Sequence, residues 1–225
     1  MCGRYSISTD SEAIGKFFDV EPVVGLSLPN FNACPTSFLP IITQQAPLSL
    51  SKGKWGFSAD WGGQKRPSTL VINARQESVL EKKMFALLTN ANRCLIPADG
   101  YFEWQRNGKT KQPFRFTLKT DQLFSFAGLF RPGKRNEVDE APCFVILTTL
   151  ANSLVGDVHH RMPVMLTKEK QNEWLSLPWN DLHEIFEPFP ANQMKSYKVT
   201  PKVNLVGFNS KDAIIQWQDP NLTLF

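Results

Sequence analysis

Cysteine is scarce in this chain, and no two cysteines have the spacing of a metal site. The four cysteines lie at positions 2, 34, 94 and 143 of 225 residues. Structural zinc sites usually contain a Cys-x-x-Cys pair, and disulfide scaffolds have denser cysteine patterns in shorter chains. The spacing therefore argues against a zinc site and against a disulfide framework, and we expect no cofactor.

Long hydrophobic runs, internal repeats, low-complexity tracts and linkers are also missing from the sequence. No apolar segment is long enough to span a bilayer, and no basic stretch followed by an apolar core marks a signal peptide. We therefore expect a single domain over residues 1–225, located in the cytoplasm and associated with the nucleoid if the protein is bacterial. The tail, residues 211–225, lies outside the clearest motifs.

The net charge is small for a protein that binds nucleic acid by charge alone. At +4, it is less than a protein that coats duplex DNA would carry. Any contact with nucleic acid must therefore be local. The 17 phenylalanines and 6 tryptophans, in contrast, leave rings available for base stacking as well as for a core.

Short apolar runs broken by proline, glycine and asparagine dominate the chain, which is typical of strands. Asn107-Gly108 is a hairpin-turn signal, since both residues tolerate positive φ. Because strands follow one another without regular helical crossovers, the pattern predicts an α+β fold with a mainly antiparallel, barrel-like sheet and short peripheral helices. The expected strands are 38–42, 93–98, 101–104, 114–118, 123–127, 142–149 and 162–166, and the expected helices are 11–18, 79–88, 168–175 and 181–186.

The start of the chain, Met1-Cys2-Gly3-Arg4, carries its most informative residue. Removal of Met1 would leave Cys2 with a free amine beside its thiol. An unperturbed thiol titrates near pKa ~8.5 and an α-amino group near ~7.7 to 8.0, so both are usable nucleophiles at neutral pH. An aldehyde captured by the amine can then be trapped by the thiol as a thiazolidine. The alternative is that Cys2 is only an early residue of a first strand.

Asn73-Ala74-Arg75 follows an apolar run, and Glu77 follows two residues later. An asparagine there can orient a terminal amine, and an arginine can bind a phosphate with two hydrogen bonds. A simple turn at the end of a strand is the alternative.

Glu103 lies between aromatic residues in Tyr101-Phe102-Glu103-Trp104. In an apolar pocket its pKa would rise, as a general acid near neutral pH requires. Alternation puts Tyr101 and Glu103 on one face of a strand, and that face can also be the solvent face.

Two of the three histidines lie in Asp157-Val158-His159-His160-Arg161. A histidine near a strand start can move protons, and Asp157 can orient it. In extended geometry the two histidines would face opposite ways, so at most one is expected to point at Cys2. Metal binding is a competing interpretation, but no further clustered ligand supports it.

Trp55 and Trp61 lie in a glycine-rich aromatic segment and are candidates for stacking on bases, with burial in the core as the alternative.

Taken together, these segments resemble the SOS-response-associated peptidase family, whose members recognise abasic sites in single-stranded DNA. The resemblance runs from residue 2 to about residue 210 and depends on the number and order of the motifs. They are Met1-Cys2-Gly3-Arg4, Phe31-Asn32-Ala33-Cys34-Pro35, Trp55-Gly56, Ile72-Asn73-Ala74-Arg75-Gln76-Glu77, 93–104, Lys111-Gln112-Pro113-Phe114, Ala127-Gly128-Leu129 and His159-His160-Arg161-Met162-Pro163.

The resemblance implies that Cys2 links covalently to the ring-opened aldehyde of an abasic site and so shields the lesion in the DNA damage response. It further implies that Asn73 positions the terminal cysteine and that Glu103 and His159 move protons. The DNA-binding residues it implies are Arg4, Arg75 and Arg161 at phosphates, and Trp55, Trp61 and Trp104 along the channel. Single-stranded DNA with abasic sites is the expected partner, with replication-associated proteins as further partners, and limited peptidase and lyase activity is implied.

Two other functions remain open from the sequence. Met1-Cys2-Gly3 also resembles the start of amino-terminal-nucleophile glutamine amidotransferases, although the glycine- and asparagine-bearing oxyanion elements of those enzymes are missing. The second alternative is a non-covalent single-stranded DNA binding module, in which arginines and tryptophans supply all the affinity.

Overall fold

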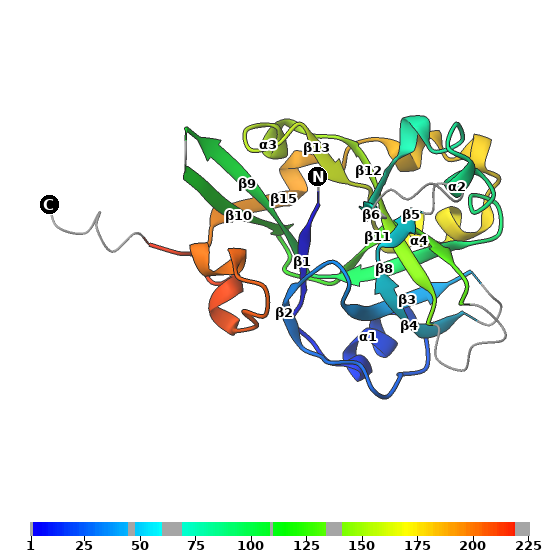
Figure 1. The fold of residues 1–225 in the computed structure, drawn as a ribbon, viewed down its shortest axis with the longest axis horizontal. Helices are drawn as coiled ribbons and strands as arrows, with labels where there is room; N and C mark the ends of the chain where they lie inside the picture. The colour runs from blue at the N-terminus through cyan, green and yellow to red at the C-terminus, as the bar shows by residue number, and fades with distance from the viewer. Residues whose placement is uncertain (1, 45–47, 60–68, 109, 134–140, 219–225) are drawn as a thin grey trace, which may run out of the picture.

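The computed structural model describes residues 2–44, 48–59, 69–108, 110–133 and 141–218, and two large β-sheets dominate it (Figure 1). The first sheet has five antiparallel strands in the order β15-β10-β9-β1-β2. These strands are β1 (Arg4–Ile7), β2 (Asn30–Ala33), β9 (Gly100–Asn107), β10 (Thr110–Leu118) and β15 (Met194–Lys198).

The second sheet closes on itself, because β12 pairs with both β4 and β11 in the ring β12-β4-β3-β8-β11. Most of its pairings are antiparallel, but β12 runs parallel to β4 and to β7. Its strands are β3 (Phe38–Thr43), β4 (Ser49–Trp55), β7 (Asn73–Arg75), β8 (Arg93–Ala98), β11 (Phe124–Arg131), β12 (Cys143–Leu150), β13 (Arg161–Pro163) and β14 (Met165–Leu166). The expected barrel-like, mainly antiparallel α+β fold is therefore confirmed.

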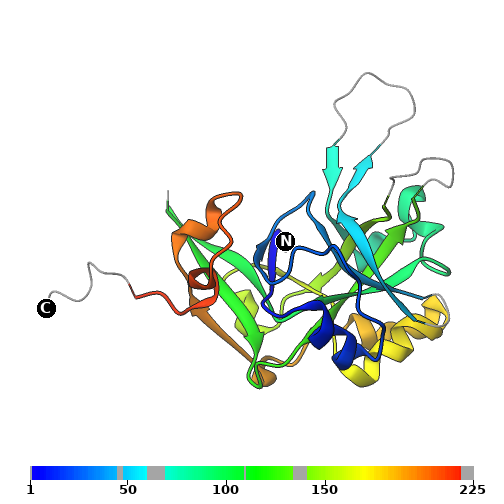
Figure 2. The same cartoon turned by 90° about the horizontal axis from the view of Figure 1, so that it is seen from below.

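A separate two-stranded arm, β5 (Phe57–Ala59) with β6 (Thr69–Val71), projects from the body of the molecule (Figure 2). Trp61 falls outside the described residues, so its predicted role stays a prediction.

The helices are short and peripheral. The expected helix 11–18 is α1 (Ser11–Phe18), and the side chain of Asp10 caps it by accepting from the amide of Ala13 at 2.8 Å. The other helices are α2 (Lys83–Ala86), α3 (Ser153–Gly156) and α4 (Lys168–Ser176), with 3₁₀ turns at Gln76–Ser78, Trp179–Asp181, His183–Phe186, Ala191–Gln193, Pro201–Asn204 and Lys211–Ile214. No helix in the described ranges is long and apolar enough to cross a membrane.

Two expected helices differ from the structure. The segment 79–88 is helical only over α2, because Lys82 has an extended backbone (φ −96°, ψ 109°) that interrupts the pattern. The segment 181–186 forms two 3₁₀ turns, since Leu182 between them has φ −89° and ψ 13°. In both places buried apolar residues of the turns pack against the core. Their spacing in the sequence therefore resembles that of an amphipathic helix.

The expected hairpin joins β9 and β10, in which Asn107 pairs with Thr110. Gly108 has φ +56°, the positive value that the turn signal predicted. Strand β9 of this hairpin carries Glu103, one of the predicted site residues. Strand β9 lies beside β1, and β1 runs through the middle of the molecule between the hairpin and the second sheet (Figures 1 and 2).

Candidate active site

Cys2 lies two residues before the start of β1 and has no exposed surface. Its thiol donates to the carbonyl oxygen of Arg4 over 3.6 Å. Burial raises the pKa of the Cys2 thiol, and the negative charge of Glu103 raises it further. The thiol is therefore protonated at neutral pH, and its reaction requires a partner that takes the proton.

Asn73 connects Cys2 to the second sheet. It begins β7, which runs parallel to β12, and its Nδ2 donates to the carbonyl oxygen of Cys2 at 2.9 Å. Its Oδ1 is buried and has no hydrogen-bond partner among the described residues. A buried acceptor of this kind is available to an incoming N–H group.

Glu103 points inward from β9, with only 3% of its surface exposed. Burial raises the pKa of this carboxyl, and nearby positive charge, including that of His160, opposes the rise. The outward-facing alternative left open by the strand pattern is therefore wrong. Glu103 lies in the environment that a general acid needs.

His159 follows α3, and its Nδ1 accepts from the backbone amide of Arg161 at 3.0 Å. The same Nδ1 lies 3.2 Å from the carbonyl oxygen of Arg161, so the backbone of Arg161 contacts this nitrogen with both its amide and its carbonyl group. Burial lowers the pKa of His159, and neighbouring positive charge lowers it further, so the neutral form prevails at pH 7.

The two histidines do not face opposite ways, as expected for an extended segment. Their rings stack with centroids 4.4 Å apart, because the bond from Arg161 to His159 curls the chain at this point. Asp157 is exposed and makes no hydrogen bond to His159 within the described part of the chain. The expectation that Asp157 orients His159 is therefore wrong, and the backbone of Arg161 does so instead.

Glu103, His159 and His160 line one pocket of about 550 Å³. Trp104, Arg106, Lys111 and Asn204 complete its lining. A second pocket of about 400 Å³ shares Trp104, Arg106 and His159. Arg106 lines both pockets and Lys111 lines the larger one, and their positive charges suit an anionic backbone.

Trp104 and Trp55, both predicted to line a DNA channel, lie in different environments. Trp104 is half-buried, and its Nε1 donates to Asn204 Oδ1 at 2.6 Å. Trp55, in contrast, has no exposed surface, donates to the carbonyl oxygen of Ile72 at 3.0 Å and stacks on Phe144. The expectation that Trp55 lines a DNA channel is wrong, because its ring is packed inside the core.

The three arginines also differ. Arg75 is exposed, and Arg4 is half-buried with a buried Nε that has no partner among the described residues. Arg161 is only 4% exposed, and its guanidinium forms a two-bond ion pair with Glu77 and donates to the carbonyl oxygen of Thr148 at 2.6 Å. A phosphate at Arg161 would have to compete with Glu77.

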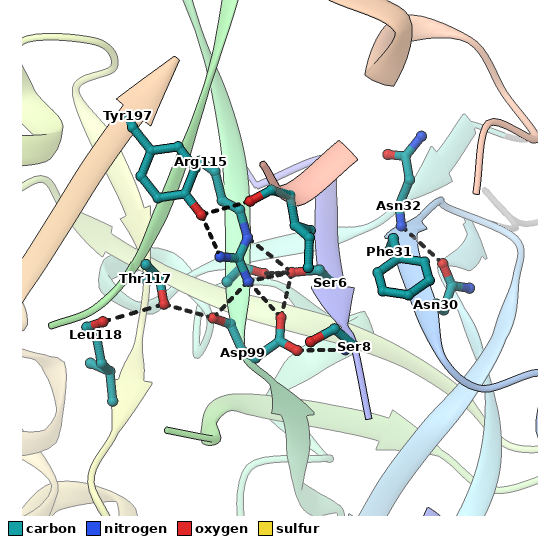
Figure 3. Close-up of polar contacts among 12 residues, drawn as sticks. Ser6, Ser8, Asn30, Phe31, Asn32, Asp99, Arg115, Thr117, Leu118 and Tyr197 are labelled. Atoms are coloured by element: carbon teal, nitrogen blue, oxygen red, sulfur yellow. Dashed lines mark hydrogen bonds and ion pairs between the residues drawn. The ribbon is translucent and has the colours of Figure 1, made fainter. Parts of the chain in front are cut away.

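A buried polar network ties β1 to the strands beside it (Figure 3). Asp99 accepts from the Ser6 hydroxyl at 2.5 Å, from the Ser8 amide at 2.5 Å and from Arg115 at 2.8 Å. Gly100 leaves room for this arginine, since a Cβ at position 100 would lie 2.7 Å from the Arg115 guanidinium. The network fixes the strand that follows Cys2 against the strand that carries Glu103.

Sequence reasoning missed Arg106 and Asn204 as pocket residues. Arg106 is two residues beyond Trp104 on the same face of β9, so strand alternation was a usable signal. Asn204 comes from a 3₁₀ turn a hundred residues later, for which the sequence carries no signal. Among the described residues, no group of three or more His, Cys, Asp or Glu converges as a metal site would require.

The fold and the site together define a protein with a buried cysteine at position 2, an amide bonded to it, a buried carboxyl whose charge acts on its thiol, and two imidazoles that line a pocket with that carboxyl. The model of the family "SOS response associated peptidase (SRAP)" matches residues 1–206, and the chain belongs to this family. The expected family membership is thus confirmed.

Several relatives are similar over most of their length. The abasic site processing protein YoqW of Bacillus subtilis is 35% identical over 221 residues, which cover 95% of this chain and 99% of YoqW. The abasic site processing protein YedK of Escherichia coli is 31% identical, over 92% of this chain and 95% of YedK. A crystal structure of a protein from Bacteroides thetaiotaomicron has the same fold, with a TM-score of 0.83 and 24% identity over 96% of this chain and all of that one.

Proposed function

We propose that this protein captures abasic sites in single-stranded DNA as a thiazolidine on Cys2, after Met1 has been removed by an aminopeptidase or by the protein itself. The observation that carries the proposal is the hydrogen bond from Asn73 to the Cys2 carbonyl beside the buried Glu103. It holds the second residue in place next to a carboxyl with a raised pKa. The names of the relatives YoqW and YedK as abasic site processing proteins support the substrate class.

The chemistry follows from the groups near Cys2. The amine attacks the aldehyde carbon of the open sugar, and water leaves as the imine forms, with Glu103 giving a proton to the departing hydroxyl. The sulfur then adds to the imine carbon while the C=N electron pair moves to nitrogen. The nitrogen gains one proton and the thiol loses one, and the neutral His159 carries this proton in the proposed reaction.

The buried position of Cys2 supports the choice of an abasic site. A nucleotide that retains its base presents a large ring at the entrance to a fully buried nucleophile, whereas an abasic sugar does not. The basic residues Arg106 and Lys111 at the pocket suit the phosphates beside the lesion, as do the half-buried Arg4 and the exposed Arg75. Trp104 is suited to contact a neighbouring base.

The test uses single-stranded DNA with one abasic site and a denaturing gel after heating. Wild-type protein should give a shifted band, and intact mass should show that Met1 is absent from the reactive molecules. Cys2→Ser and a variant with an extra residue before Cys2 should give no heat-stable band. Cys34→Ser is the matched control, since it removes a thiol that is more accessible than that of Cys2 and should crosslink like wild type.

Equal crosslinking by Cys2→Ala would overturn the proposal. Binding that depends on salt but ignores the lesion, with no covalent band, would instead favour a non-covalent binding module. Release of ammonia from glutamine would favour an amidotransferase.

A further inference from the structure

Two tyrosines near Cys2 have hydroxyl groups that the fold does not use. Tyr5 on β1 and Tyr101 on β9 are direct partners across the two strands, and neither has any exposed surface. Both rings contact Phe126, with centroid distances of 5.6 Å and 6.1 Å. Both hydroxyl oxygens are buried without a hydrogen-bond partner in the described ranges.

Such hydroxyls are unusual. Burying a hydroxyl without a partner costs free energy, whereas phenylalanine would fill nearly the same volume at no such cost. Tyr197 shows the ordinary arrangement in this protein, since its hydroxyl accepts from Arg115 and donates to the carbonyl oxygen of Ile214, both at 2.8 Å. Each orphaned phenol therefore calls for an explanation.

The surroundings of the two phenols point to Cys2. Tyr101 shares its face of β9 with Glu103, and Cys2 belongs to the same buried cluster as both tyrosines. Burial raises the pKa of each phenol, and a negative charge on Cys2 raises it further. For Tyr5 a charge on Cys94 has the same effect, and for Tyr101 a charge on Glu103 does. Tyr101 thus lies on the face of β9 that carries the proposed acid, in the same buried cluster as Cys2.

We propose that the Tyr101 hydroxyl, with Tyr5 beside it, donates a hydrogen bond to the Cys2 sulfur as that sulfur loses its proton and closes the ring. This inference rests on the proposed function. The tyrosine keeps its own proton, the S–C bond forms, and the thiol proton ends on the ring nitrogen through the groups already described. The hydroxyl acts only while charge develops on sulfur, which explains why it is unpaired before reaction.

The two chemical steps can be measured separately with the same abasic-site DNA. Borohydride traps the imine, and the heat-stable band formed without reductant reports ring closure. Tyr101→Phe should leave imine trapping within twofold of wild type and slow ring closure about tenfold, as expected for loss of one hydrogen bond to a charged group. Tyr5→Phe should slow ring closure less. Both variants should melt at or above the wild-type temperature, because no folded-state hydrogen bond is lost.

Ser125→Ala is the matched control, since Ser125 on β11 also has a fully buried hydroxyl without a partner among the described residues. It should leave both steps unchanged. Ring closure at the wild-type rate in Tyr101→Phe, or an equal slowing of both steps with a lower melting temperature, would overturn the inference while leaving the proposed function standing. Absence of any crosslink by wild-type protein would instead remove the proposed function.

Discussion

The side-chain amide of Asn73 donates a 2.9 Å hydrogen bond to the carbonyl oxygen of Cys2, so a strand of the second sheet holds the residue that precedes β1 in the first. The two residues are far apart in the sequence: Asn73 belongs to the second sheet, and Cys2 precedes a strand of the first. Their contact makes the position of the proposed nucleophile a property of the whole fold.

Replacing Asn73 with Asp should test this contact, because a carboxylate has nearly the same shape but cannot donate. The change should lower stability by about 1 kcal/mol, the usual worth of a single hydrogen bond, and slow crosslinking at least tenfold. Thermal unfolding and the rate of the heat-stable band measure the two effects. A wild-type rate in Asn73→Asp would show that this donor does not position Cys2.

Glu103 should make stability depend on pH. Burial raises its folded-state pKa above the unfolded value, so the folded protein binds the proton more tightly. The stabilising contribution of that proton is complete below the unfolded pKa, near ~4.3, and is lost as pH rises through the folded pKa, by about 1.4 kcal/mol for each unit of the shift. Glu103→Gln should therefore be more stable than wild type at pH 8 and lose this advantage at pH 4.

The same substitution removes the proposed acid, so crosslinking by Glu103→Gln should fall at all pH values even where the variant is more stable. Melting temperatures between pH 4 and pH 8, measured beside crosslinking rates, separate the two effects. A matched control is Glu81→Gln, which changes an exposed carboxyl and should alter neither curve. Parallel melting curves for Glu103→Gln and wild type would contradict the assignment of a raised pKa.

Trp55 and Trp104 should respond to replacement by alanine in opposite ways. Trp104→Ala should leave stability within about 1 kcal/mol of wild type, as half-exposed positions usually do, and weaken binding to single-stranded DNA by about 1 to 3 kcal/mol if a base stacks there. Trp55→Ala should cost about 3 to 5 kcal/mol of stability, because it opens a cavity in the core. Urea unfolding and fluorescence anisotropy of labelled DNA measure these quantities. Equal DNA affinity in Trp104→Ala and wild type would exclude the stacking role.

Part of this fold can be predicted from the sequence, because some strands are buried along their whole length. The strand 93–98 was predicted with its observed bounds because every residue in it is buried, which gives a continuous apolar run. The short strands β1 and β7 were not predicted, since each has three or four residues, includes polar ones and is defined by partners far away in the sequence. They are the strands that position Cys2 and Asn73.

The motif resemblance predicts the residues of the candidate site, but it does not predict that these residues are buried. Alternation gave the correct face for Glu103, yet could not say whether that face is inside, because the two faces of β9 are both rich in aromatic residues. Trp55 was misjudged for a similar reason: the ring of Phe144 that covers it lies in a strand about ninety residues away. Burial of a side chain depends on such distant neighbours.

The Asp99–Arg115 pair provides a final test of what holds Cys2 in place. Both side chains are less than 10% exposed, so Asp99→Asn leaves a buried guanidinium with weaker partners and should cost about 3 to 5 kcal/mol. The exposed pair of Lys195 with Asp121 is the matched control, and Asp121→Asn should cost no more than about 1 kcal/mol.

Because Asp99 also binds Ser6 and Ser8 of the segment that follows Cys2, its loss should slow crosslinking further than the lower stability explains. Crosslinking is therefore best compared at a temperature where both variants are fully folded by circular dichroism. A wild-type rate in folded Asp99→Asn would show that the network stabilises the fold without positioning the nucleophile.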